Sequence, residues 1–154
     1  RLGSGLGAQS SSMNIHDAYN QVESSLHMAL SAGKQTMHLL PDSHKDIAVN
    51  ELNSYMQHAA MNAHFADSAY GEGNHKEASQ HLENLQESMR ALHQAAKDKM
   101  GPHSALTQAY NVTMPGFHKA ADTYREVAGG RSASLGKDFE GIMKNSNINP
   151  KQFD

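Results

Sequence analysis

Histidine is the residue type most able to supply chemistry in this chain, because eleven histidines occur among 154 residues and cysteine is absent. Histidine binds transition metals and haem, and its side chain titrates near neutral pH. A metal site inside a helical bundle needs ligands three or four residues apart on one inward face. No two histidines have that spacing, and the one Glu-x-x-His sequence, Glu72 to His75, falls in a predicted turn.

The spacing therefore favours boundary and surface histidines, and we predict neither a metal ion nor another cofactor. If a metal or haem site existed, its histidine ligands would be His58, His64 and His81, which could flank one helical hairpin. A pH-responsive interface is the other alternative, since the histidines would gain charge together below about pH 6.5. The closest histidine–carboxylate pairs at helical spacing are Glu23/His27, Glu77/His81, His64/Asp67 and His118/Asp122.

Nucleophilic catalysis and phosphate binding have little support in the sequence. No serine stands in a Gly-x-Ser-x-Gly elbow, and cysteine nucleophiles are excluded. The glycine-rich stretch at residues 3–7 lacks the lysine, strand and helix of a phosphate-binding loop. Methionines at helical spacing are typical of core filling rather than haem ligation. We therefore predict that the chain is not an enzyme.

Composition and charge point to an all-α fold and exclude several partners. Alanine is the commonest apolar residue, nine methionines are present, aromatic residues make up only 6%, and tryptophan is absent. Alanine favours helices, whereas the residues that favour strands are few. The net charge of −3 comes without a basic run, so neither a nucleic-acid interface nor a polybasic membrane patch is expected. No apolar stretch approaches the roughly 20 residues that a membrane-spanning helix needs.

Apolar residues at intervals of three and four predict four helices, at residues 14–40, 43–70, 74–100 and 102–128. Asn14 is expected to cap the first, Ser43 with Asp46 the second, and Asn74 with Glu77 the third. Pro115 followed by glycine predicts either a sharp kink in the fourth helix or two pieces, 102–112 and 115–128. Short connections favour antiparallel neighbours, so the simplest packing is an up-down bundle of about four helices.

Residues 62–85 resemble a single tetratricopeptide unit, with the turn at residues 73–78 and a small residue at Ala66. The closing proline of that repeat is missing, and no second copy follows at its period. We interpret the resemblance as the pattern of one tight helical hairpin.

Both ends of the chain differ in composition from the predicted bundle at residues 14–128. Residues 1–13 are expected to be a flexible arm, as an expression scar or as the start of a chain matured by cleavage. Residues 129–154 are expected to be a linker and a C-terminal arm, with a short helix at 137–144. These arms carry apolar residues that could either fold back on the bundle or bind a partner, namely Leu2, Leu6, Leu135, Phe139, Ile142, Met143 and Phe153.

These features predict a non-enzymatic structural or interaction protein that docks through its arms and one bundle face. The partners would be proteins of a larger assembly or further copies of the chain. The most concrete version is a phage or virus virion component, capsid-associated or internal, so a virion or cytoplasmic location is expected. The alternative is a bundle that binds a small ligand or a metal through its histidines. Because cysteine is absent, the chain is not expected to be a secreted protein that is stabilised by disulfides.

Overall fold

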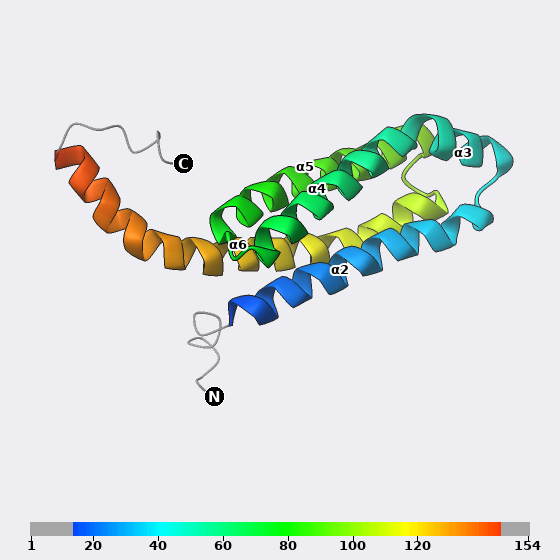
Figure 1. The fold of residues 1–154 in the computed structure, drawn as a ribbon. Coiled ribbons are helices and arrows are strands. Elements are labelled where there is room, and N and C mark those ends of the chain that lie inside the picture. The colour runs from blue at the N-terminus through cyan, green and yellow to red at the C-terminus, as the bar shows by residue number, and fades with distance from the viewer. Residues whose placement is uncertain (1–13, 146–154) are drawn as a thin grey trace.

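A computed structural model describes residues 14–145 of the chain, and side chains through residue 129. The described residues are helical and contain no strand (Figure 1). The elements are α2 (Ile15–Thr36), the 3-10 turn η1 (Met37–Leu39), α3 (Asp42–Ile47), the π-helical segment η2 (Ala48–Leu52), α4 (Asn53–Gly71), α5 (His75–Met100) and α6 (Ala105–Asn145). The predicted all-α bundle is confirmed.

The long helices form two antiparallel pairs. Helix α2 packs along α6, α4 packs along α5, and α5 joins the two pairs by packing on α6. Figure 1 shows the α4/α5 pair lying over the α2/α6 pair. The backbones of α2 and α4 do not pack closely against each other, so one of the four sides of the bundle is more open than the rest.

The caps of two helices are confirmed. The Asn14 side chain accepts a hydrogen bond of 2.7 Å from the His16 backbone N–H at the start of α2. Asn74 accepts one of 3.1 Å from the Glu77 N–H at the start of α5. Each satisfies an N–H that the first helical turn leaves without a partner. The reverse half of the predicted Asn74–Glu77 box is not formed, because the Asn74 N–H donates to the Ala69 carbonyl at 2.9 Å.

The predicted cap of the second helix is wrong. Helix α3 begins at Asp42 with Pro41 at its N-cap, and no side chain there accepts a hydrogen bond. The Pro41 carbonyl accepts from the His44 and Lys45 N–H groups at 2.9 and 3.0 Å, so the first turn closes without a capping side chain. From Asp42 to Gly71 the chain is helical almost throughout, with the π segment η2 in place of regular α-helix. The π turn takes up one extra residue, so it changes which residues of α3 and α4 share a face.

Three predictions about the fourth helix are corrected. The helix starts at Ala105 rather than residue 102, and Ser104 Oγ accepts from the Thr107 N–H at 3.1 Å. It is not split, because α6 runs without interruption through Pro115. Packing against both α2 and α5 outweighs the one hydrogen bond that proline removes. The linker expected from residue 129 is also wrong, since α6 continues to Asn145 and passes beyond the end of the bundle in Figure 1.

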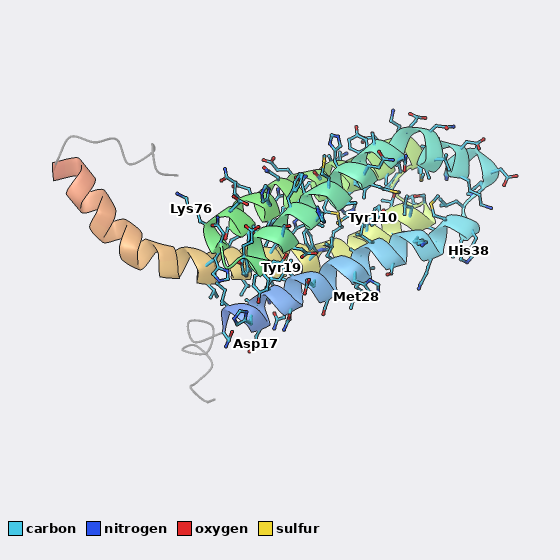
Figure 2. All side chains as sticks on the ribbon, in the orientation of Figure 1. Asp17, Tyr19, Met28, His38, Lys76 and Tyr110 are labelled. Carbon is cyan, nitrogen blue, oxygen red and sulfur yellow. The ribbon has the colours of Figure 1, made fainter. Side chains whose placement is uncertain are left out.

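The buried core has an aromatic end and an aliphatic middle. Tyr19 stacks on Tyr70 with ring centroids 3.9 Å apart, and Tyr124 meets Tyr19 edge-on at 5.1 Å. Further along, α2 approaches α6 at Gly33, where an added Cβ would lie 2.7 Å from the Tyr110 hydroxyl. Figure 2 shows Tyr19 and Tyr110 among the interior side chains. The large aliphatic side chains of α5 are fully buried between the two pairs, namely Leu82, Leu85, Met89 and Leu92.

Candidate binding groove between α2 and α4

A groove of about 250 Å³ lies on the open side of the bundle. Helices α2 and α4 form its two walls, and α5 supplies its floor. Along α2 it extends from Tyr19 to Leu30, a rise of roughly 16 Å at 1.5 Å per residue. Most of its lining is apolar, namely Val22, Leu26, Leu30, Ala63, Ala66, Leu82 and Leu85.

The apolar lining differs in depth. Val22, Ala66, Leu82 and Leu85 are buried members of the core, whereas Leu26, Leu30 and Ala63 are only partly buried. Small alanines on α4 limit the height of that wall, and Gly33 lets α2 approach α6. The groove therefore exposes apolar surface beside a continuous core.

Polar groups gather where the groove meets the aromatic end of the bundle. Glu23 and Asp67 both line it, and their carboxyl groups lie within hydrogen-bonding reach of each other. The Tyr19 hydroxyl donates to Asp67 Oδ1, and Tyr70 stacks on the Tyr19 ring. The tyrosine hydroxyl thus fixes the carboxyl group of Asp67 at the edge of the apolar lining.

The protonation of this end follows from its surroundings. Burial raises the pKa of Glu23 above its usual value, and the negative charge of nearby Asp67 together with their hydrogen bond raises it further. Burial also raises the pKa of Tyr19, with the Asp67 hydrogen bond as the next cause, so Tyr19 remains a donor at neutral pH. An added positive charge would favour ionisation of Glu23.

Like most carboxyl groups whose side chains are described, Glu23 and Asp67 have no lysine or arginine partner. By contrast, Glu51 pairs with Lys99 at 2.9 Å. The groove consequently presents uncompensated negative charge next to apolar surface.

The histidines are not brought together. His58 and His64 are exposed on α4, whereas His81 on α5 lies 3.7 Å from Glu77 and its ring packs beside Phe65. No group of three or more histidine, aspartate or glutamate side chains among the described residues could hold a metal ion. The haem or metal set named from the sequence is therefore not assembled by the fold.

Other histidines have structural surroundings. His75 Nδ1 lies 2.8 Å from the Tyr124 hydroxyl, and His16 Nδ1 contacts the Tyr70 hydroxyl, so both cover the aromatic end. His118 lies beside the buried Gln86, and burial lowers its pKa, with the positive charge of Arg90 as the next cause. Such a histidine stays neutral at physiological pH.

The predicted partner-binding residues fall on the ends of the chain. Leu2, Leu6 and Phe153 lie outside the described residues. The others lie in the last part of α6, where the structure describes the helix but no side chains, namely Leu135, Phe139, Ile142 and Met143. Their predicted role stays a prediction.

Two polar residues of the groove were named from the sequence, but their proximity was not predicted. Glu23 and Asp67 appeared only as members of the local pairs Glu23/His27 and His64/Asp67. In the structure Glu23, His27 and Asp67 line one groove, while His64 is not part of its lining. The signal available in the sequence was a carboxylate at the edge of an apolar stripe on each of two helices.

Comparison with protein families, curated proteins and solved structures gives no match for this chain. None of the helices in residues 14–145 has the length and apolar character required to cross a bilayer.

Proposed function

We propose that this chain is a non-enzymatic binding protein whose bundle holds a narrow apolar ligand in the groove between α2 and α4. The observation that supports it best is the partly exposed apolar lining of Leu26, Leu30 and Ala63 directly above the buried core. An apolar groove with a few polar groups at one end is the usual form of a small-molecule site.

The size of the groove favours a chain-like ligand. Its volume of about 250 Å³ lies just below the roughly 300–1,000 Å³ of typical ligand pockets. Each methylene group removed from water contributes about 0.8 kcal/mol, so a short alkyl chain along the groove would gain several such increments. A whole helix would not fit this volume.

Binding of a neutral apolar dye tests the proposal. N-phenyl-1-naphthylamine, whose fluorescence rises in apolar surroundings, should bind the full chain saturably with one site per chain. Ala63→Leu would place a larger side chain in the groove and should weaken binding about tenfold, or about 1.4 kcal/mol. The matched control is Val112→Leu, at an exposed position of α6 outside the groove. Absence of saturable binding, or equal affinity of both variants, would contradict the proposal.

A second candidate function is docking onto other proteins through the end of α6. Figure 1 shows this helix continuing past the bundle, and its sequence places Leu135, Phe139 and Ile142 at helical spacing. This candidate corresponds to the structural role predicted from the sequence, in which the chain would bind protein partners of a larger assembly in a virion or in the cytoplasm. The virion setting itself stays a prediction.

Deletion of residues 130–154 tests the second candidate. Native mass spectrometry should show association of the full chain that the shortened chain loses, while thermal unfolding of the shortened chain stays cooperative. If the full chain is monomeric at all concentrations, self-association through the end of α6 is excluded. Loss of cooperative unfolding would instead show that the segment belongs to the core.

A further inference from the structure

We propose that the ligand of the α2/α4 groove is a small aliphatic amine, whose alkyl chain lies along Leu26, Leu30 and Ala63 and whose ammonium group lies between Glu23 and Asp67. This inference rests on the proposed binding function and names the chemical class of the ligand. It is carried by the juxtaposition of a narrow apolar groove with two carboxyl groups that lack a cation.

The polarity of the groove sets the orientation of the ligand. Glu23 and Asp67 stand near the Tyr19 end, and Leu30 stands at the other end of the α2 wall. A ligand with one charged end and one apolar end would therefore place its head beside Tyr19 and its tail beside Leu30. The reverse orientation would place the head beside Leu30 and the neighbouring His27, away from the carboxylates, and would leave these without a partner, which costs free energy.

The head group must be a hydrogen-bond donor with positive charge. Carboxylates accept hydrogen bonds, and an ammonium group supplies three donors on a compact cation. The Tyr19 hydroxyl donates to Asp67 Oδ1, and an ammonium group would take the place of the hydrogen bond between the two carboxyl groups. An alkyl ammonium has a pKa near the roughly 10.4 of lysine, so it is charged at neutral pH.

The carboxyl groups of the groove have no lysine or arginine that would compete with an amine. On the α5/α6 side of the bundle, Arg125 contacts both Glu83 and Asp122. A described lysine or arginine does not do the same for Glu23 or Asp67. A free metal ion would not use the apolar lining, and the described residues offer no three-ligand cluster for one. An amine uses both features of the groove.

Isothermal titration calorimetry of the full chain with octylamine, octanol and octanoate at pH 7 tests the inference. The three probes share one alkyl chain and differ in head charge, and each is kept below its aggregation concentration. Octylamine should bind at one site per chain and about tenfold more tightly than octanol, with octanoate weakest. Glu23→Gln and Asp67→Asn should each reduce octylamine affinity several-fold and leave octanol affinity unchanged. Glu126→Gln, at an exposed carboxylate of α6, is the matched control and should change neither.

The outcomes separate this inference from the function on which it rests. If octanol binds as tightly as octylamine, or if Glu23→Gln and Asp67→Asn leave octylamine affinity intact, the amine assignment is wrong while apolar binding stands. If none of the three probes binds, both are wrong. Sedimentation velocity on the same samples tests whether a second copy of the chain occupies the groove. A ligand-free dimer that Ala63→Leu dissociates would assign the groove to that second copy and contradict the amine proposal.

Discussion

The α5/α6 interface and the α2/α4 groove place carboxylates at the edge of the same core but treat them differently. At α5/α6, the fully buried Gln86 donates to Asp122 at 2.9 Å and accepts from Arg125 at 3.0 Å. Arg125 also lies 3.6 Å from Glu83. Every member of this cluster has a partner, and the two helices pack closely there.

At the α2/α4 groove the corresponding compensation is absent. Glu23 and Asp67 lie beside each other, and Tyr19 donates to Asp67. Both carboxylates are on exposed residues, and the pKa of Glu23 is raised first by partial burial and then by the charge of Asp67. The α5/α6 interface therefore stabilises the fold, whereas the groove keeps a locally unfavourable charge arrangement that a bound cation would relieve.

The largest expected difference between the two regions concerns large-to-small substitutions. Leu92→Ala, at a fully buried position of α5, should lower the free energy of unfolding by about 2–5 kcal/mol because it leaves a cavity. Leu30→Ala, in the partly exposed groove wall, should cost only about 1 kcal/mol, since it removes part of a wall that water already reaches. Urea unfolding measures both. Equal losses would mean that the groove is closed in solution.

Substitution of glycine tests why α2 follows α6 rather than α4. Gly33→Ala would put a Cβ 2.7 Å from the Tyr110 hydroxyl and 2.8 Å from its ring, so it should destabilise by about 1–3 kcal/mol through overpacking. Gly116→Ala is the matched control, because nothing lies within 4 Å of its added Cβ, and it should stabilise α6 by up to about 1 kcal/mol. Thermal unfolding of the two variants should therefore shift in opposite directions. A shift of Gly33→Ala to higher temperature would show that this close approach is not present.

Removal of the central amide tests the compensated cluster. Gln86→Leu keeps the size of the side chain but takes two hydrogen bonds from Asp122 and Arg125, and should cost about 1 kcal/mol. The cost stays small because Asp122 is exposed and Arg125 keeps its contact with Glu83. Chemical denaturation at low and high salt measures it. An increase in stability would mean that the network serves specificity rather than stability.

Removal of the Glu23 charge should have the smallest effect and the opposite sign. The folded pKa of Glu23 is raised, so between its usual pKa near 4.5 and the higher folded value the native state holds more protons than the unfolded state. Stability from this group is therefore full at lower pH and falls as pH rises through that window. Glu23→Gln should remove this fall and slightly stabilise the chain at pH 7, measured as unfolding midpoints from pH 4 to 7. A variant less stable than the parent at pH 7 would contradict the uncompensated pair.

The presence of the helices was predicted better from the sequence than the residues at which they end or the distances between them. Asn14 and Asn74 were identified because a capping amide acts on amides two or three residues away. Pro115 and the glycines from residue 129 were misread, since local propensity does not register the packing of α6 on two neighbours or the continuation of a helix already formed.

The groove was beyond prediction for a related reason. Periodicity identifies which face of a helix is apolar but not how far apart two helices lie. Tyr19 and Asp67 are separated by 48 residues, and their contact depends on α2 following α6 while α4 follows α5. Two local carboxylate–histidine pairs were visible in the sequence, yet only the fold shows that Glu23 and Asp67 belong to one site.

Methyl and amide NMR of the full chain during titration with octylamine tests the central claim most directly, because it reports where the probe binds. We expect saturable shifts concentrated at Leu26, Leu30, Ala63 and the amides of Glu23 and Asp67, with little change at Leu92 or Val112. Shifts that are scattered over the surface, fail to saturate, or appear only outside the groove would contradict it.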